Sequence, residues 1–249
     1  MNLLALVGRA GSGKDTVADI LVRDHHWTKI ALADPMKRAA RDFFQFTDEQ
    51  LWGPSALRNA PDERFPREHT TRETAGLRCD CCGMDLDTGL GETAPQCYLT
   101  PRHALQQLGT EFGRRCYPDV WVDYAVRTAE AILVPNALRR VWQYSPERGL
   151  YDPYHPNTVL LGYIGPKGVV ISDARFPNEV AAIRAKGGRI WKTVHGVGLS
   201  GAAGAHESER YIDSLEVDTV VPDSGLDALP GIIANMLNET QGDGASSPA

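Results

Sequence analysis

The sequence predicts an α/β fold in which a parallel sheet is flanked by helices. Two short, continuous apolar runs, residues 2–7 (NLLALV) and 168–172 (GVVIS), have the pattern of strands buried on both faces. Strand-like and helix-like segments alternate along much of the chain, as in a parallel sheet with helical crossovers. The chain has 249 residues, of which 42% are hydrophobic and 23% charged, so it can bury a sizeable core.

In the first half of the chain, each predicted element depends on a local signal. Asp34-Pro35 can open a helix, Thr100-Pro101 combines an N-cap with a proline in the first turn, and Asp119 can cap a further helix. The remaining elements expected here are a strand at 2–7, a helix at 15–23 and a strand at 28–32.

In the second half, strands and helices alternate again. Pro177 is expected to start a helix that Gly187-Gly188 ends. The other expected elements are strands at 168–172, 189–194 and 217–221 and a helix at 226–237.

Two stretches interrupt this pattern, residues 47–100 and 139–167. They are rich in proline, glycine or charge and show no sustained period. We therefore expect an irregular insertion or a small subdomain at 47–100 and a second irregular segment at 139–167. The prediction is one domain over 1–240 with insertions at about 47–99 and 139–167, followed by a disordered tail at 241–249.

The net charge of −6 is a poor match for broad duplex-DNA binding, which usually needs a basic surface. No apolar run approaches the roughly 20 residues of a membrane span, and the N-terminus does not resemble a signal peptide. We therefore expect a cytoplasmic protein without stable nucleic-acid or membrane partners.

A glycine-rich loop between the first strand and the first helix predicts a phosphate site. Its glycines let backbone N–H groups curl around an anion, and Lys14 can reach the β- and γ-phosphates of a nucleotide. By itself the loop predicts a phosphate binder on a P-loop NTPase-type sheet. Its candidate residues are Gly11, Ser12, Gly13, Lys14, Asp15 and Thr16.

The loop departs from the usual motif in one respect. The residue after the lysine is ordinarily Ser or Thr, a ligand of Mg²⁺, but here it is Asp15, and Thr16 follows. Thr16 could bind Mg²⁺ directly, whereas Asp15 could bind the metal, act through water or only cap the helix. Asp173, at the end of the GVVIS run, fits a second acidic element that holds Mg²⁺ or its water.

Several segments together resemble bacteriophage deoxynucleoside monophosphate kinases. They are GRAGSGKDT (8–16), ADPMK (33–37), RET (72–74), TPRHALQQLGTEFGRRCYPDVW (100–121), SDARFPNEVAAIRAKGG (172–188) and HESE (206–209). The resemblance implies phosphoryl transfer from ATP to a deoxynucleoside 5'-monophosphate for phage DNA synthesis in the host cytoplasm. Positions 195–196 (HG) depart from an expected Arg-Pro-Gly-like turn, which puts base contacts there in doubt.

The resemblance also implies roles for individual residues. It implies that the loop residues named above, Gly11 to Thr16, bind the phosphates of ATP. Lys14, Asp173 and Arg175 would be catalytic, and Glu179 would complete the same edge. The residues implied for the acceptor are Lys37, Arg72 and Arg102 for its phosphate and Gly109, Thr110 and Trp121 for its nucleoside. A homodimer is compatible with the resemblance, although no sequence signal indicates one.

Four of the five cysteines lie close together between residues 79 and 97. Cys79 and Cys82 form a Cys-x2-Cys-Gly knuckle, and Cys97 could be a third ligand of a structural zinc ion. Cys81, His103 or His69 could supply the fourth ligand.

Two other functions compete with the monophosphate kinase. One is a P-loop kinase for another small phosphorylated acceptor, such as dephospho-coenzyme A. The other is a nucleotide-dependent nucleic-acid-binding module that uses the cysteine cluster as a zinc finger, against which the acidic net charge argues.

Overall fold

The structure is a computed structural model that describes residues 2–70, 78–85, 95–133, 143–145, 150–152, 166–194 and 211–242. The chain divides into two compact units, one of residues 1–32 and 122–249 and the other of residues 33–121. The predicted boundaries of a single domain over 1–240 stay a prediction.

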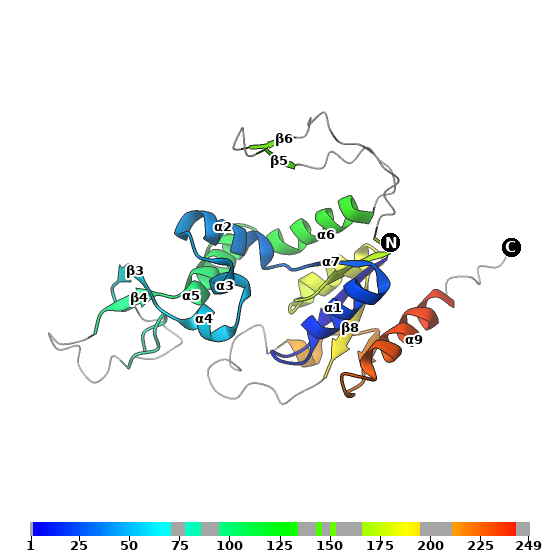
Figure 1. Cartoon of the computed structure of the whole chain (residues 1–249). Coiled ribbons are helices and arrows are strands. Elements are labelled where there is room, and N and C mark those ends of the chain that lie inside the picture. The colour runs from blue at the N-terminus through cyan, green and yellow to red at the C-terminus, as the bar shows by residue number, and fades with distance from the viewer. Residues whose placement is uncertain are drawn as a thin grey trace. The chain divides into compact units, whose positions relative to one another are not determined.

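The first unit contains a five-stranded sheet in which every pairing is parallel. Its strand order is β2-β7-β1-β8-β9, so the first strand of the chain lies at the centre (Figure 1). The strands are β1 (Leu3–Val7), β2 (Trp27–Ile30), β7 (Gly168–Ile171), β8 (Arg189–Thr193) and β9 (Thr219–Val221).

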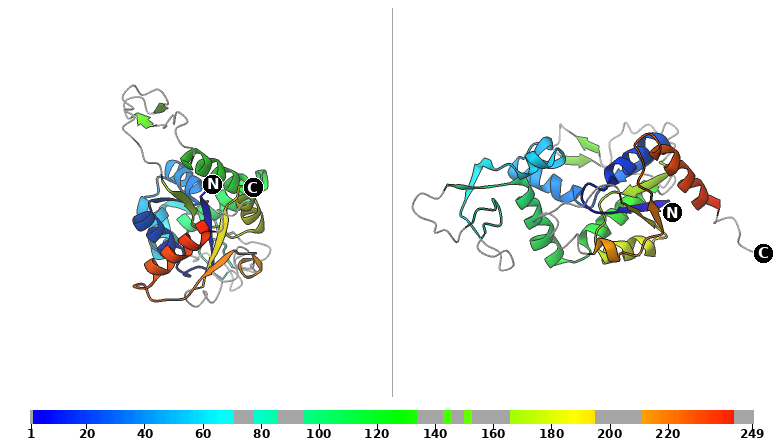
Figure 2. Two further views of the ribbon diagram at one scale, coloured as in Figure 1. Left: turned by 90° about the vertical axis from the view of Figure 1, so that its right-hand side faces the viewer. Right: turned by 90° about the horizontal axis from the view of Figure 1, so that it is seen from below.

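Helices cover both faces of this sheet. The right-hand view of Figure 2 shows α1 (Lys14–His25, blue) and α9 (Leu229–Gly242, red) on one side and α7 (Pro177–Ala185, olive-yellow) on the other. Along β1, Leu4 and Leu6 join the core cluster of α1 and α9, whereas Leu3 lies near Gly188 at the end of α7. A strand covered on both faces must be apolar throughout, which explains the NLLALV and GVVIS runs. The predicted α/β class with a P-loop NTPase-like sheet is confirmed.

Element boundaries in this unit follow the sequence signals closely. All five predicted strands are present, and the helix after Pro177 ends before Gly187 and Gly188 as expected. The last helix differs, because it begins at Leu229 and continues to Gly242, past the predicted end at residue 237 and into the predicted tail. Residues 243–249 lie outside the described residues.

The second unit is mostly helical. Its elements are α2 (Asp34–Phe44), α3 (Asp48–Trp52), α4 (Ser55–Asn59), β3 (Asp62–Arg67), β4 (Cys97–Leu99), α5 (Pro101–Gln106) and the π-helix η1 (Gln107–Arg114). Helix α6 (Val120–Leu133) begins here and continues into the first unit. As predicted, the Thr100 hydroxyl caps α5 by accepting a hydrogen bond from the His103 N–H, at 3.1 Å.

Within the stretch 47–100, expected to be an irregular insertion or a small subdomain, the described residues form regular elements. Two five-residue helices and an antiparallel strand pair, β3–β4, lie there. Thr47 and Gln50 form a complete capping box on α3, which supports a helix too short to show a hydrophobic period. Phe44, Phe46 and Phe65 pack with ring centroids 5.2–5.8 Å apart and anchor this region to α2.

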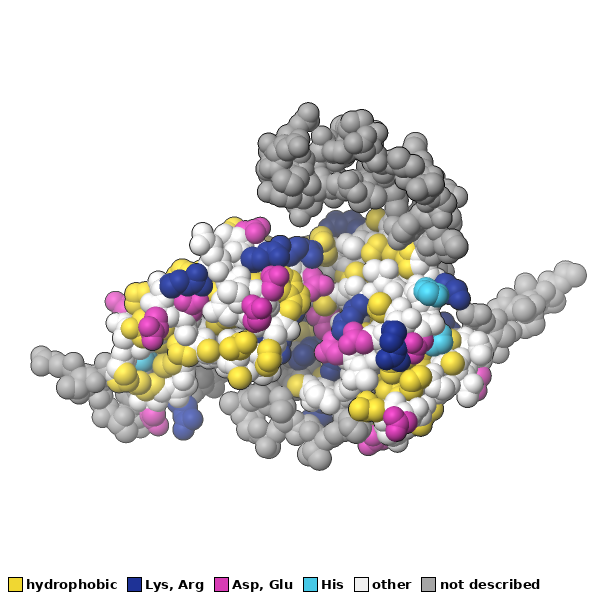
Figure 3. Space-filling view, in the orientation of Figure 1, with side chains coloured by type: hydrophobic (Ala, Val, Ile, Leu, Met, Phe, Trp, Pro, Cys, Tyr) yellow, Lys and Arg dark blue, Asp and Glu magenta, His cyan; other side chains and the backbone are white. Residues whose placement is uncertain are grey.

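Of the predicted insertion at 139–167, the structure describes one antiparallel pair, β5 (Gln143–Ser145) with β6 (Leu150–Asp152), and the two residues before β7. Among the described helices, none is long and apolar enough to cross a membrane. On the face shown in Figure 3, basic side chains lie among acidic ones, so neither sign of charge dominates that face.

Candidate active site

The phosphate loop occupies residues 8–13, between the end of β1 and the start of α1. Gly8, Gly11 and Gly13 have φ values of 152°, 80° and 84°, which L-residues with side chains rarely adopt. Gly13 is the N-cap of α1, so the first turn of the helix adds its N–H groups and the positive end of its dipole to the loop. These are the features of an anion site.

Lys14 lies inside this loop and is only 7% exposed. Its ammonium group donates hydrogen bonds to the Gly8 carbonyl at 2.6 Å and to the Arg9 carbonyl at 2.7 Å. A buried ammonium needs such partners, because an unpaired charge is costly to remove from water. The loop therefore carries a positive charge at its centre.

Thr193, at the end of β8, is a site residue that the sequence analysis missed. Its hydroxyl lies 2.7 Å from the Ser12 hydroxyl and 3.4 Å from the Val7 carbonyl. A Cβ atom on Gly8 would lie 2.5 Å from both the Ser12 and the Thr193 hydroxyl oxygens, so a side chain at this position would clash with them. The only sequence signal was a polar residue at the end of an otherwise predicted strand.

Asp15 and Thr16 lie on the first turn of α1. The Asp15 carboxylate is 82% exposed and forms a salt bridge with Lys29 on β2 at 2.8 Å. Burial lowers the pKa of Lys29, but hydrogen bonds to Asp15 and Asp19 outweigh it and raise the pKa. Thr16 is half-buried. The salt bridge of Asp15 and the partial burial of Thr16 do not decide which of the two residues binds Mg²⁺. Both assignments therefore stay predictions.

Asp173 follows β7, the direct neighbour of β1 in the sheet. One of its carboxylate oxygens accepts a hydrogen bond from the Leu32 backbone N–H at 2.7 Å. In a parallel sheet the carboxyl ends of neighbouring strands meet at one edge, which is where α/β proteins bind ligands. Asp173 and the phosphate loop therefore share that edge of the sheet.

Glu179 has a structural contact that the sequence analysis did not assign. Its side chain is buried, and one carboxylate oxygen accepts hydrogen bonds from the N–H groups of Arg175 at 2.7 Å and Phe176 at 3.0 Å. It thus caps α7 and fixes the backbone of Arg175. Its predicted role toward substrate stays a prediction.

An ion-pair group at the same edge was also missed. Arg9, in the loop, and Lys192, on β8, both pair with Asp213. Hydrogen bonds from Arg9 and Lys192 lower the pKa of the Asp213 carboxyl. The side chains of Arg9 and Asp213 are 45% and 59% exposed, so their ion pair contributes little to stability.

Of the residues predicted for the phosphate and nucleoside of the acceptor, those that the structure describes lie in the second unit. The Lys37 ammonium is 5.4 Å from the centre of the Trp52 ring, whose indole N–H donates to Asp34 at 3.1 Å. Arg102, at the start of α5, is exposed and donates to the Asn59 side chain.

Trp121 packs on the π-helix η1, which contains Gly109 and Thr110. Its indole N–H donates to the Gly109 carbonyl at 2.9 Å, and a Cβ atom on Gly113 would lie 2.2 Å from the indole ring. Gly109 and Trp121 are therefore in contact, as a shared role requires. Short π-helical stretches are frequent at functional sites.

Two sets of predicted residues are thus placed by the structure, one in each unit. Arg72, with the RET segment, lies outside the described residues, as do residues 195–196 and the HESE segment. The residues at the sheet edge of the first unit are Gly11, Ser12, Gly13, Lys14, Asp15, Thr16, Asp173, Arg175 and Glu179.

The three predicted zinc ligands, Cys79, Cys82 and Cys97, do lie together, and His69 joins them. Burial opposes ionisation of Cys79, but hydrogen bonds from the backbone N–H groups of Cys82 and Cys81 lower its pKa to about 6. Burial raises the pKa of the Cys97 thiol. Cys81 points elsewhere, with its thiol 3.2 Å from the Tyr98 carbonyl.

A cleft of about 180 Å³ lies at the other edge of the sheet, lined by Asn2, Trp27, Lys167 and Arg189 among others. These residues stand at or before the amino ends of strands. Because ligands of such sheets bind at the carboxyl ends, this cleft is not the candidate site.

Comparison with known proteins gives one informative similarity. No protein-family model matches the chain. The chain is 27% identical over 221 residues to a protein of Acanthamoeba polyphaga mimivirus that carries the provisional name deoxynucleotide monophosphate kinase. The alignment covers 89% of this chain and 87% of that protein. Since the relative comes from a virus of amoebae, the similarity does not point to phages in particular.

Proposed function

We propose that this chain is a kinase that transfers the terminal phosphoryl group of ATP to a deoxynucleoside 5'-monophosphate. The observation that carries the proposal is the buried Lys14 at the start of α1, in a loop that follows the central strand of a parallel sheet. The mimivirus relative, similar over most of both chains, supports a kinase in general terms and suggests the acceptor.

Phosphoryl transfer needs positioning and charge neutralisation more than covalent chemistry. In the proposed reaction the Lys14 ammonium exchanges its bonds with the Gly8 and Arg9 carbonyls for bonds to the β- and γ-phosphates of ATP. The N–H groups of the loop and of the first turn of α1 bind the remaining phosphate oxygens. Arg175, whose backbone Glu179 fixes, would offset charge on the transferred group.

The donor set at this edge fits Mg²⁺, which prefers carboxylate and hydroxyl oxygens and retains several waters. Asp173 and Thr16 would hold the ion directly or through water, and Asp15 is a further carboxylate on the same turn as Thr16. A bound Mg²⁺ would neutralise charge on the phosphate oxygens of ATP.

For the acceptor we propose the residues that the family resemblance implies. Lys37, Arg72 and Arg102 would bind its phosphate, because a dianionic group needs cations of its own. Gly109, Thr110 and Trp121 would shape the nucleoside pocket, and the contact between Trp121 and Gly109 supports this pairing.

The test is an acceptor panel. Purified protein is incubated with ATP, Mg²⁺ and single deoxynucleoside or ribonucleoside 5'-monophosphates or dephospho-coenzyme A, and ADP and the phosphorylated product are quantified by chromatography. We expect a deoxynucleoside diphosphate as product. Turnover of dephospho-coenzyme A alone, or no transfer to any acceptor, would overturn the proposal.

A matched pair of lysine variants locates the chemistry. Lys14→Ala should lower kcat by about 10²–10³-fold or more, the range for a lost charge stabiliser. Lys186→Ala should leave it unchanged, because Lys186 pairs with Glu130 after the end of α7, away from the loop edge. Equal activities of the two variants would contradict a role for the loop.

A further inference from the structure

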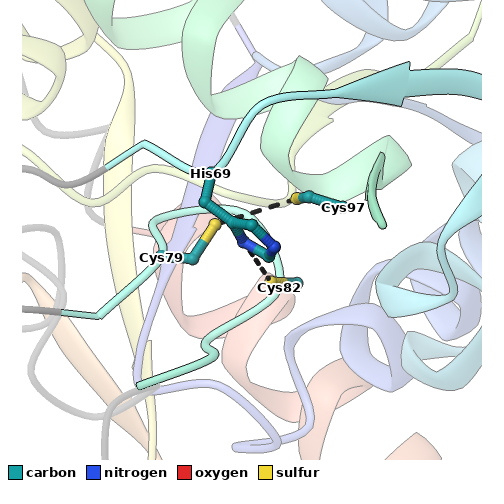
Figure 4. Close-up of side chains that lie close together, drawn as sticks. All are labelled: His69, Cys79, Cys82 and Cys97. Atoms are coloured by element: carbon teal, nitrogen blue, oxygen red, sulfur yellow. Dashed lines mark hydrogen bonds between the residues drawn. The ribbon is translucent and has the colours of Figure 1, made fainter. Parts of the chain in front are cut away.

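Four side chains in the second unit converge on one point. The Nδ1 atom of His69 and the sulfur atoms of Cys79, Cys82 and Cys97 all lie within 4.8 Å of one another (Figure 4). They come from three places along the chain, namely the segment after β3, a tight loop at 79–83 and the first residue of β4. Pairing of Arg67 on β3 with Cys97 on β4 brings the first and last of these together.

Two distances between these atoms match those of a tetrahedral zinc site. With Zn–S bonds of about 2.3 Å and a Zn–N bond of about 2.0–2.1 Å, two ligand sulfurs lie about 3.8 Å apart and a sulfur and a nitrogen about 3.5 Å apart. The Cys79 and Cys97 sulfurs are 3.8 Å apart, and the Cys82 sulfur is 3.6 Å from His69 Nδ1. Two of the six distances between ligand atoms therefore have the values of a tetrahedral zinc site, and the other four are no longer than 4.8 Å.

The loop at 79–83 has the backbone of a zinc knuckle. The Gly83 N–H donates to the Cys79 carbonyl at 2.9 Å, and Gly83 has a φ of 74°, where a side chain would be strained. The turn directs the sulfurs of Cys79 and Cys82 to the same side, while Cys81 is directed toward the Tyr98 carbonyl.

The other ring nitrogen of His69 fixes which nitrogen can bind a metal. Nε2 lies 3.0 Å from the Pro95 carbonyl. A carbonyl only accepts hydrogen bonds, so Nε2 carries the proton and the lone pair of Nδ1 faces the sulfurs. Metal-bound histidines commonly donate their second N–H to such a carbonyl.

We infer that His69, Cys79, Cys82 and Cys97 bind one zinc ion in a closed structural site. Four protein ligands fill a tetrahedron and leave no position for water or substrate, which distinguishes a structural site from a catalytic one. The site joins β3 to β4, a two-stranded pair that is marginal by itself. Binding releases the thiol protons, and the ion stabilises the folded form of this segment.

The first experiment measures the metal in the full-length protein, purified without chelator. Elemental analysis should find one zinc per chain. After removal of zinc, titration with Co²⁺ should give the intense visible bands of a tetrahedral thiolate site with one equivalent. Absence of zinc together with absence of these bands would overturn the inference and would indicate free thiols.

Adjacent cysteines provide a matched control. Cys82→Ser should lose the zinc, whereas Cys81→Ser should keep one equivalent and the Co²⁺ spectrum. A chelator should lower the midpoint of thermal unfolding of the wild type and of Cys81→Ser but leave Cys82→Ser unchanged. Equal zinc loss in both variants would overturn the ligand set. These readouts do not involve phosphoryl transfer, so they stand or fall separately from the proposed function.

Discussion

Gly8→Ala is the sharpest test of how the phosphate loop is built. The new Cβ would lie 2.5 Å from the Ser12 and Thr193 hydroxyl oxygens and 2.7 Å from the Thr193 carbonyl oxygen. The hydroxyls can rotate, but the Thr193 carbonyl belongs to β8, which is paired with β1 and cannot move freely. Overpacking of this kind costs about 1–3 kcal/mol, and a non-glycine residue at positive φ adds about 1–2 kcal/mol.

Gly11→Ala is the matched control. Gly11 also has a positive φ, of 80°, but nothing lies within 4 Å of a Cβ placed there, so only the backbone cost applies. At about 2–4 °C per kcal/mol for a chain of this size, we expect the midpoint of thermal unfolding to fall by roughly 4–20 °C for Gly8→Ala and by roughly 2–8 °C for Gly11→Ala. Differential scanning calorimetry measures both. Equal falls would refute the packing argument.

Two further predictions concern buried carboxylates. Asp62 lies buried beside Arg64, whose hydrogen bonds hold the pKa of that carboxyl far below its usual range. Asp62→Asn should therefore lower the free energy of unfolding by about 1–3 kcal/mol at pH 7. Because folding lowers the pKa of Asp62, the stability that its carboxylate contributes is lost as the pH falls below about 4. Urea titrations should therefore show a smaller difference in free energy of unfolding between the wild type and Asp62→Asn at low pH. A difference that stays constant with pH would contradict this prediction. Glu179→Ala should lower the free energy of unfolding by about 1–2 kcal/mol, because α7 loses its cap. Glu179→Gln keeps an acceptor oxygen and should lower it by less in the same assay. Equal losses would argue against capping.

The sheet was predictable from sequence because its signals are continuous and local. A central parallel strand buries both faces, so β1 and β7 are uninterrupted apolar runs. The second unit was harder to predict for the opposite reason. In β3, charged residues flank Phe65, Pro66 stands at a register shift, and its pairing partner lies about 30 residues away in the sequence.

The site was predictable only in part. The glycine loop and Lys14 are close together in the sequence and predict a phosphate site by themselves. Thr193 is far from Ser12 in the sequence, and the two hydroxyls meet only because β8 pairs with β1. Likewise, sequence left three candidates for the fourth metal ligand, and the pairing of β3 with β4 selects His69. Contacts of this kind depend on register, which the sequence pattern alone does not specify.

The central place of β1 has a consequence for synthesis of the chain. Strand β1 is synthesised before both of its partners, because β7 begins at residue 168 and β8 at residue 189. At roughly 5–20 residues per second, the NLLALV segment waits on the order of ten seconds or more without them. Residues 33–121 can meanwhile complete their own contacts, which lie within that stretch. A chain that stops before Arg189 would leave one edge of an apolar strand unpaired, open to association with other chains.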